Sequence, residues 1–441
     1  ERLNQQLFQV MEQFENERKQ LRKLIAEKDF AVGEIQKRCK AMMKKMSTFN
    51  IRENDLCEKL LLQEEVRRSL HNKVMQLSGN IRVFIRVRPT LSNEDSNLEM
   101  PFSFPTIFDS SRSPSDRDVT VSDDLTKRFI VATEPTKDRG GLSQRQKKLK
   151  LGFDNVFDPS QKQEDVWKAT EPLIQSAVDG YNVCVFAYGQ TGSGKTYTML
   201  GNDESPGVIR KSIRKLFNEK RALEEASKGA ASAQISVELL EIYNEQVRDL
   251  LNEKKGTEGY ENFNLALSSN EAVGNVVFEA NHEEEVFSVL EKAQKRRCVK
   301  ATKSNAESSR SHLIFSMNYI VTKASGVQRK SKLSICDLAG SERLSKSESY
   351  GSARKEAQHI NKSLSTLSNV IEKLQQKSNH VPYRESKLTC LLHNSLGGDS
   401  KTLAIICCNP LGDHFQESTC SLRFAQKLNK VELKALGNIS C

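Results

Sequence analysis

The sequence predicts an α/β domain with a central, mostly parallel β-sheet covered by helices on both faces, preceded by an N-terminal α-helical coiled coil. The first 88 residues contain no proline and repeat apolar residues at every seventh position. From residue 81 to about residue 430, short apolar stretches alternate with amphipathic helical ones, which is the pattern of a sheet with helices on both faces. We therefore expect a stalk and neck helix over 1–78, a globular domain over 79–430 and a tail over 431–441.

Composition excludes several classes of protein. Lys and Arg exceed Asp and Glu by a net +10, which favours an acidic partner without being typical of a nucleic-acid binder. The ten cysteines form no CxxC pair, so we expect reduced thiols in a cytosolic or nuclear protein. No run of 18 apolar residues occurs and the first residues are polar, so we expect neither secretion nor membrane insertion. The chain starts with Glu1 in mid-pattern, which predicts a fragment of a longer protein.

The coiled coil is predicted from one strong heptad line. Positions 7, 14, 21 and onwards to 77 are apolar in nine of eleven cases. The companion line from 3 to 73 is weak, with only Leu3, Val10, Leu24, Ala31 and Val66 apolar. We predict a parallel dimer that is loosely zipped over about 38–60. The alternative is a single amphipathic helix packed on its own globule, although eleven heptads would span roughly 100 Å.

The elements of the globular domain follow in order. Gly79 and Asn80 end the helix, and IRVFIRVRP (81–89) alternates apolar and basic residues like a half-buried strand. Residues 90–150 predict strands joined by surface loops, and their basic run RQKKLK is either a loop or an extra contact with a partner. Five further strands alternate with five helices, in segments that begin with NVCVFAYG and end with ESTCSLRFAQKLNKVEL.

The segment GQTGSGKT (189–196) fits the phosphate-binding loop pattern G-x-x-x-x-G-K-[ST]. It follows a predicted strand and precedes a predicted helix, so backbone N–H groups converge on phosphate oxygens. Lys195 is expected to reach the β- and γ-phosphates, and Thr196 to bind Mg²⁺. The other expected nucleotide contacts in this loop are Gly189, Gln190, Thr191, Gly192, Ser193 and Gly194. The alternative is a glycine-rich turn without a ligand.

Two further segments supply what such a loop requires. The strand KLSICDLAG places Asp337 at its end as a metal-side acid, and the N–H of Gly340 is expected to bond the γ-phosphate. In NAESSRSH (305–312), Ser309 can contact Mg²⁺ or the attacking water, and Arg310 can pair with Glu342. Taken alone, this Ser-rich stretch also fits an ordinary loop. His312 beside a serine could suggest a nucleophilic triad, but no acid or oxyanion partner accompanies it.

These motifs, together with RVRP (86–89), resemble the nucleotide site of the kinesin motor domain, and the similarity covers roughly residues 80–430. The resemblance implies an ATP- and Mg²⁺-dependent ATPase that is stimulated by microtubules. It implies that Arg86, Arg88, Pro89 and Tyr197 hold the adenine ring. Asn305, Ser308, Ser309 and Arg310 would form switch I, and Asp337, Gly340 and Glu342 would form switch II, closed by an Arg310–Glu342 ion pair. Metal contacts would come from Thr196, Ser309 and Asp337.

The resemblance also implies a filament-binding surface. Kinesins bind the acidic surface of tubulin through the long helix after switch II and the segment HVPYRESKLT, which here places Lys373, Lys377, His380, Arg384 and Lys387 at the filament. A solvated helix face is the alternative explanation of this charge. A GTPase is the nearest rival activity, but NKSL (361–364) has Leu364 where a guanine-reading motif needs a carboxylate, so ATP is favoured.

The order of the parts resembles the C-terminal-motor class, kinesin-14, because the coiled coil precedes the motor. That class implies movement towards microtubule minus ends, work in the spindle and a location on the cytoplasmic cytoskeleton. The neck helix over about 60–78 would dock on the motor core and swing as a lever. A second hypothesis is a non-catalytic microtubule crosslinker or a regulatory subunit of a kinesin heterodimer, against which the complete set of site residues argues.

Overall fold

The computed structural model describes residues 2–77, 79, 81–92, 94, 100–105, 129–134, 148–227, 229, 231–252, 265–268, 270–299, 309–323, 325–343, 352–398 and 400–431. The chain divides into two compact units, Glu1–His71 and Asn72–Cys441. None of the described helices combines the length and the apolar character that a membrane crossing requires.

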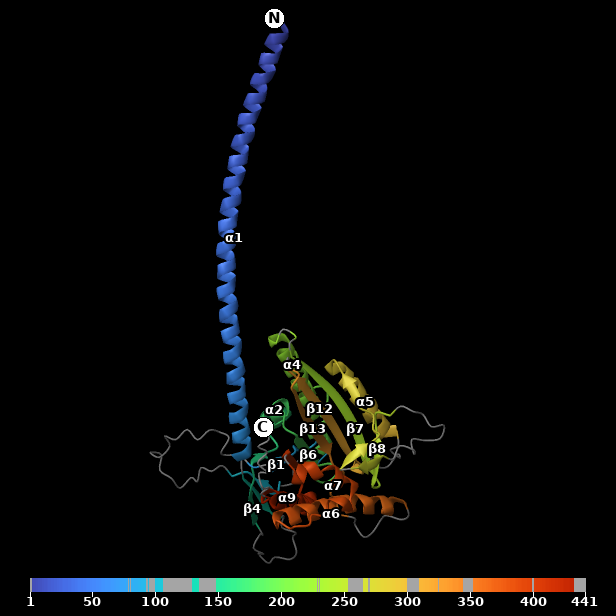
Figure 1. The fold of residues 1–441 in the computed structure, drawn as a ribbon. Helices are drawn as coiled ribbons and strands as arrows, with labels where there is room; N and C mark the ends of the chain where they lie inside the picture. The colour runs from blue at the N-terminus through green and yellow to red at the C-terminus, as the bar shows by residue number, and fades with distance from the viewer. Residues whose placement is uncertain are drawn as a thin grey trace, which may run out of the picture. The chain divides into compact units, whose positions relative to one another are not determined.

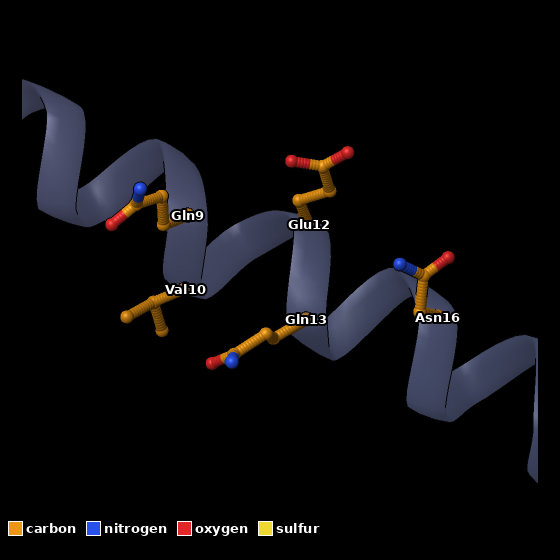
Figure 2. Close-up of a pocket in the computed structure, with 5 residues that line it drawn as sticks. All are labelled: Gln9, Val10, Glu12, Gln13 and Asn16. Carbon is orange, nitrogen blue, oxygen red and sulfur yellow. The ribbon is translucent and has the colours of Figure 1, made fainter.

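Helix α1 runs without interruption over Arg2–Leu77, through Gly33 (Figure 1). Its apolar heptad side chains, among them Phe14, Ile35 and Phe49, are each more than half exposed. A shallow groove on this helix is lined by Gln9, Val10, Glu12, Gln13 and Asn16, whose side chains are labelled in Figure 2. Because all five come from consecutive turns of a single helix, the groove is an open surface rather than an enclosed site.

The exposed side chains of α1 include a further heptad line, which lies one residue after the companion line that starts at Leu3. Positions 11, 18, 25 and onwards to 74 alternate with the first line at spacings of four and three, as a and d positions do. Its exposed apolar members are Met11, Ile25, Val32, Cys39, Met46, Leu60 and Val74. Leu3, Val10, Leu24 and Val66 of the companion line are exposed as well. Cys39, Met46 and Leu60 of the further line lie inside 38–60, where loose zipping stays a prediction.

The second unit is built on one mixed sheet whose strand order is β11-β7-β12-β13-β6-β14-β1-β5, with β8 paired to β7. Strands β5, β1, β14, β6, β13 and β7 run in one direction, and β12, β11 and β8 run in the other. The predicted mostly parallel sheet is confirmed. Its strands are β1 Ile81–Val87, β5 Asn155–Phe157, β6 Val183–Tyr188, β7 Ser232–Tyr243, β8 Gln246–Asp249, β11 Phe278–Ala280, β12 His312–Thr322, β13 Gln328–Asp337 and β14 Lys401–Cys408.

Helices cover both faces of this sheet, as expected (Figure 1). Strand β6 shows why, because Val185 packs into one apolar cluster and Phe186 into the other. The first face carries α2 Gln163–Val178, α3 Lys195–Met199, α4 Val208–Ala226 and α5 Glu283–Val299. The second face carries α6 Ser352–Gln375, η5 Tyr383–Glu385, α7 Lys387–Leu391, α8 His393–Gly397 and α9 Phe415–Asn429, with η6 Gly412–His414 leading into α9.

Two small antiparallel sheets complete the described part of the domain. Strands β2 Phe102–Ser103, β3 Phe129–Thr133 and β4 Lys148–Gly152 form one, and β9 Ala266–Ser268 pairs with β10 Glu271–Val273 in the other. The strands expected between 90 and 150 are thus present. Of the basic run RQKKLK, residues 148–150 lie in β4 and the others lie outside the described residues.

The end of α1 belongs to the second unit. Gly79 adopts a left-handed φ of +89° and donates its N–H to the carbonyl of Gln76 at 3.1 Å, which ends the helix as its sequence predicts. Met75 is buried against the core, and its sulfur accepts a contact from Arg82 Nη2 at 3.1 Å. The end of the predicted neck, from Asn72 onwards, thus belongs to the globular unit, and Met75 shares its core.

Candidate active site

The carboxyl ends of β6, β13, β1 and β14 meet at one edge of the sheet, where open α/β sheets usually bind ligands. Register pairs Ala187 with Asp337 across β6 and β13, and Val87 with Cys408 across β1 and β14. Segments that are far apart in the sequence therefore deliver their terminal side chains to one place. That place holds the loop 189–196, Asp337 and the RVRP segment.

The loop after β6 is held tightly enough that a side chain could not replace its first glycine. Gly189 has a φ of +150°, and a Cβ added there would lie 2.2 Å from the carbonyl oxygen of Cys407. The hydroxyl of Ser193 donates to the carbonyl of Gln190 at 2.7 Å, which closes the turn. The backbone then enters α3 at Lys195, as expected of a loop that cradles phosphates.

Lys195 lies inside this loop, with only 6% of its surface exposed. Its Nζ donates to the carbonyl oxygens of Gly189 at 2.8 Å and Gln190 at 2.9 Å. Burial lowers the pKa of Lys195, while the nearby acids Asp337 and Glu342 oppose that shift. The ammonium is thus held where it can neutralise an anion that enters the loop.

Thr196 and Asp337 make the pair expected of a metal site. The Thr196 hydroxyl donates to Asp337 Oδ2 at 2.7 Å, and Asp337 is 1% exposed. Asp337 Oδ1 is buried without a hydrogen-bond partner, which leaves one carboxylate oxygen for a metal ion or its bound water. Burial raises the pKa of Asp337, opposed first by Arg297, then by Lys195 and by the bond from Thr196.

The donor set fits magnesium rather than a metal held by protein alone. No group of three or more His, Cys, Asp or Glu side chains gathers into a metal site within the described ranges. Mg²⁺ characteristically takes one or two protein oxygens and completes its shell with water and phosphate. The Thr196 hydroxyl and the buried Asp337 carboxylate, whose Oδ1 has no hydrogen-bond partner, are consistent with this coordination.

The two switch segments are joined directly through their backbones. The N–H of Gly340 donates to the carbonyl of Ser309 at 2.8 Å. In this arrangement that donor has a protein acceptor, and its expected bond to a γ-phosphate stays a prediction. A Cβ at Gly340 would lie 2.4 Å from the Thr191 hydroxyl and 2.3 Å from the Glu342 carboxylate, so a larger residue would have to displace these two side chains.

Arg310 and Glu342 each have another partner in this arrangement, and the ion pair expected between them over a γ-phosphate stays a prediction. Arg310 Nη1 pairs instead with Glu356 Oε2 in α6 at 2.7 Å. Glu342 accepts from the backbone N–H of Thr191 at 2.9 Å and from its hydroxyl at 2.5 Å. Arg310 therefore pairs with a residue of α6, whereas Glu342 is bonded to Thr191 in the loop 189–196. The sequence pattern identified Glu356 only as part of a helix.

The adenine-side residues divide into two groups. Arg86 is 5% exposed, and its Nη1 donates to Gln163 Oε1 at 2.6 Å and to Thr198 Oγ1 at 2.8 Å. Its guanidinium lies 5.5 Å from the centre of the Tyr197 ring, and Gln163 Nε2 donates to the Tyr197 carbonyl at 2.5 Å. Tyr197 is 45% exposed. The buried Arg86 therefore packs against the Tyr197 ring, and the exposed part of that ring is accessible to a ligand.

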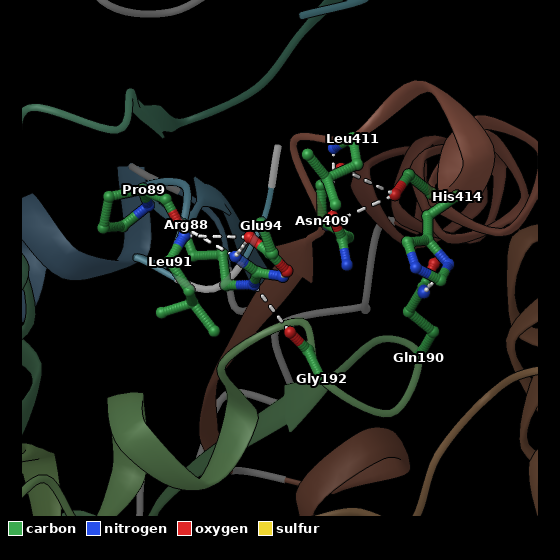
Figure 3. Close-up of polar contacts among 10 residues, drawn as sticks. Arg88, Pro89, Leu91, Glu94, Gln190, Gly192, Asn409, Leu411 and His414 are labelled. Carbon is green, nitrogen blue, oxygen red and sulfur yellow. Dashed lines mark hydrogen bonds and ion pairs between the residues drawn. The ribbon is translucent and has the colours of Figure 1, made fainter. Parts of the chain in front are cut away.

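Arg88 ties the loop 189–196 to the residues after β1 (Figure 3). Its Nε donates to the Gly192 carbonyl at 2.7 Å, and its Nη1 to the Pro89 carbonyl at 2.9 Å. The same guanidinium is paired with Glu94, and this pairing lowers the pKa of Glu94 to about 2. The adenine-side arginine thus has most of its donors engaged by protein.

His414 contacts the loop 189–196 through the side chain of Gln190. Its Nδ1 lies 2.9 Å from Gln190 Nε2 (Figure 3). The sequence patterns did not identify His414, Glu94 and Gln163 as neighbours of the site. No local spacing could have found His414 or Gln163, because 224 and 34 residues separate them from Gln190 and Tyr197.

The remaining predicted residues lie either outside the described part or on one basic surface. Asn305 and Ser308 lie outside the described residues. Lys377, His380 and Arg384 are exposed, and Lys373 and Lys387 are half-buried. They belong to the end of α6, the turn after it, η5 and the start of α7, which pack against one another. The structure therefore brings the predicted filament residues onto adjacent elements.

Comparisons with known proteins agree with this geometry. The kinesin motor domain model matches residues 86–431. The chain is 41% identical over 396 residues to kinesin-like protein 2 of Schizosaccharomyces pombe, covering 88% of this chain and 45% of that protein. It is 40% identical over 386 residues to kinesin-like protein KIN-14N of Oryza sativa, covering 85% and 46%. The chain thus spans about half the length of these curated relatives.

Solved structures give the same result. The structure of the C-terminal motor and motor homology domain of Kar3Vik1, fused to a synthetic heterodimeric coiled coil, aligns with a TM-score of 0.73 and 33% identity. The alignment covers 91% of this chain and 99% of that one. The motor domain of the Kar3-like kinesin from Ashbya gossypii aligns with a TM-score of 0.60 and 33% identity, covering 80% and 100%.

Proposed function

Since this chain belongs to the kinesin family, within its C-terminal-motor (kinesin-14) class, we propose that it is a microtubule motor that couples ATP hydrolysis to force or sliding along the filament. The observation that carries the proposal is the Thr196–Asp337 pair at 2.7 Å beside a buried Lys195, with one oxygen of Asp337 unpartnered. These groups supply what phosphoryl transfer asks of a protein, namely positioning and charge neutralisation.

ATP and Mg²⁺ would be held by the residues already placed at the sheet edge. Lys195 and the backbone of residues 189–196 would bind the phosphates, Thr196 and Asp337 would hold the hydrated metal, and Tyr197 would stack on the adenine. Bound Mg²⁺ supplies charge neutralisation at the phosphates. Ser309 and Arg310 reach the same edge through the backbone bond between Ser309 and Gly340. They are therefore in position to change with the outermost phosphate.

The filament face is proposed on α6, η5 and α7. The exposed basic side chains there suit the acidic surface of tubulin, and such an attraction weakens as salt screens it. Helix α6 also carries Glu356, the partner of Arg310, so the helix that would touch the filament is tied directly to a switch residue. Movement towards minus ends and a role in the spindle are proposed from the class alone.

Dimerisation through α1 is supported by charges on its two heptad lines. Arg18 and Glu53 occupy one line, and each follows directly after an opposite charge, Glu17 and Arg52. In a parallel, in-register pair, a residue at position a lies beside the preceding g residue of the other chain. Arg18 would then face Glu17 of a second copy, and Glu53 would face Arg52. Arg67 lies on the same line but pairs with Glu64 of its own helix. Because the pairs at Arg18 and Glu53 match in two identical chains, we propose a second copy of this chain as the partner.

Phosphate release with and without microtubules tests the proposed function. We expect microtubules to stimulate phosphate release. The affinity of the chain for microtubules should fall as ionic strength rises. Microtubule binding without ATP turnover would instead support the second hypothesis, a non-catalytic microtubule crosslinker or a regulatory subunit of a kinesin heterodimer. Gliding of polarity-marked filaments over the immobilised chain then measures the direction of travel.

A further inference from the structure

The hairpin turn between β7 and β8 contains a glutamate in a backbone conformation that usually favours glycine. Asn244 and Glu245 join the two strands with φ angles of +49° and +58°, and Tyr243 pairs with Gln246 across the turn. Turns of this kind most often have glycine at their second position, because a side chain there strains the backbone. A strained residue of this kind indicates that its side chain has a role that glycine could not fill.

The Glu245 carboxylate holds the start of helix α7. Its Oε2 accepts the backbone N–H of Lys387, the first residue of α7, at 3.0 Å. The first N–H groups of a helix have no acceptor within the helix itself. The other oxygen, Oε1, is buried without a hydrogen-bond partner, so the carboxylate gives up hydration to make this bond. A residue of the β7–β8 turn thus helps to cap a helix that begins 142 residues later.

The other end of α7 is held by a second residue in the left-handed conformation. Asn270 lies just before β10 and has a φ of +69°. Its Oδ1 accepts the thiol of Cys390 in α7 at 3.6 Å, and its Nδ2 lies 3.1 Å from Nδ1 of His393 in α8. A helix of five residues has too few internal hydrogen bonds to be stable by itself. The contacts at its two ends therefore determine where α7 lies.

The position of the turn in the sheet connects this anchor to the nucleotide site. Strand β7 runs in the same direction as β6 and β13, so its last residues lie at the edge of the sheet that carries the loop 189–196. Ile242 of β7 pairs with His312 of β12, which places the turn beside the backbone that follows Arg310. Helix α7 is therefore anchored to the part of the sheet that lies next to a switch residue.

We propose that Glu245 is a positioning residue of the filament-binding surface, and that Asn270 serves the same purpose at the far end of α7. By holding the backbone of Lys387, Glu245 fixes the direction in which the basic side chains of η5 and α7 meet an acidic filament. This inference rests on the proposed function, because it deepens the account of how that surface binds.

Glu245→Gly separates the contact from the strain. Glycine adopts the left-handed conformation freely, so the melting temperature should change little, but the acceptor for the Lys387 N–H is lost. The KM for microtubules in stimulated phosphate release should rise roughly tenfold, as expected for the loss of one hydrogen bond to a charged group, with little change in kcat. Glu245→Gln keeps an oxygen at the end of a side chain of the same length and should restore most of the affinity.

Asn244→Gly is the matched control. It relieves the same kind of strain in the same turn, and the side-chain Oδ1 that it removes has no hydrogen-bond partner, so the KM for microtubules should stay at the wild-type value. A direct effect of the Glu245 charge predicts the opposite result to ours. The filament is acidic, so loss of a negative charge alone would tighten binding in both Glu245→Gly and Glu245→Gln.

The outcomes are therefore distinct. Equal microtubule affinity in Glu245→Gly and Asn244→Gly, or tighter binding in both Glu245 variants, would overturn the inference. If Glu245→Gly does not fold, Asn270→Gly decides, because it should raise the KM for microtubules in the same way and an unchanged KM would overturn the inference. A wild-type chain that does not bind microtubules would instead refute the proposed function.

Discussion

The imidazole Nε2 of His312 lies 2.8 Å from the hydroxyl of Ser363, which joins the first residue of β12 to the middle of α6. The other ring nitrogen, Nδ1, accepts the N–H of Ala339 at 3.0 Å, so Nε2 carries the hydrogen and donates to Ser363. His312 is 2% exposed, and burial lowers its pKa to about 3. This neutral ring connects the loop after Asp337 to the proposed filament helix, and with both nitrogens engaged it is no catalytic triad member.

Removing this connection should uncouple the filament from the nucleotide site. His312→Ala leaves the N–H of Ala339 without its acceptor, which costs about 1–3 kcal/mol of folding free energy. Ser363→Ala should cost less folding free energy than His312→Ala. It should lower the microtubule stimulation of phosphate release more than it lowers basal release. Ser365→Ala is the control, because the exposed Ser365 hydroxyl bonds only the Lys362 carbonyl within α6, at 3.0 Å. Equal stimulation in the Ser363→Ala and wild-type chains would contradict the coupling role.

Lys195→Ala should abolish turnover. The ammonium is the buried cation closest to the proposed phosphates, and loss of one such group usually lowers kcat by roughly 10²–10³-fold. Nucleotide affinity, measured by equilibrium binding of ADP, should fall as well. Lys211→Ala on α4 is the comparison, because Lys211 lies outside the site and pairs with Glu164. Full activity in Lys195→Ala would remove the basis of the proposed hydrolysis.

Arg310 and Glu356 should act as one unit. Arg310→Gln and Glu356→Gln should each slow hydrolysis far more than they weaken nucleotide binding. The double variant should be little worse than either single one, with a coupling free energy of roughly 0.5–3 kcal/mol. Single-turnover rates measured for the four proteins of the cycle give this coupling. Strict additivity would show that the pair at 2.7 Å has no role in hydrolysis.

The charges on α1 predict a rescue experiment. Arg52→Glu places like charges beside Glu53 of a second copy and should weaken the dimer, as should Glu53→Arg. The double swap restores opposite charges and should recover most of the dimer, as measured by sedimentation of the full chain. Arg38→Glu is the control, since Met43 lies at the position it would face in the second copy. Failure of the double swap would argue against a second copy in register.

Lys401 predicts a dependence of stability on alkaline pH. Its Nζ lies 3.9 Å from the centre of the Tyr181 ring, and burial lowers the pKa of Lys401 to about 8. Below pH 8 the folded protein bears the cost of a buried charge, and this cost disappears as pH rises from 8 towards 10.5, the usual lysine pKa, where the unfolded chain also loses its proton. Relative to Lys401→Met, the wild-type protein should therefore gain stability over that range in urea unfolding. A constant difference would mean that Lys401 keeps an ordinary pKa.

Local spacing in the sequence determined the elements and the phosphate-binding loop. The heptad line of α1, the alternation in β1 and the pattern of residues 189–196 each describe a short stretch of backbone, whose geometry follows from neighbouring residues. Asp337 is predicted beside Lys195 and Thr196 because a phosphate-binding loop needs an acid at the end of a neighbouring strand, which the motif and the strand pattern together supply. Both candidate second lines on α1 are present in the sequence, and the choice between them stays a prediction.

Tertiary structure alone decided which charges and donors meet. Arg310 pairs with Glu356 in α6, and the N–H of Gly340 bonds the carbonyl of Ser309, although these partners lie in segments that are far apart along the chain. Glu241, Leu313 and Asp337 are brought into one row by the register of three strands, which no spacing along the chain encodes. Contacts between distant segments depend on packing of the whole sheet, so a motif can name the groups of a site but not their partners.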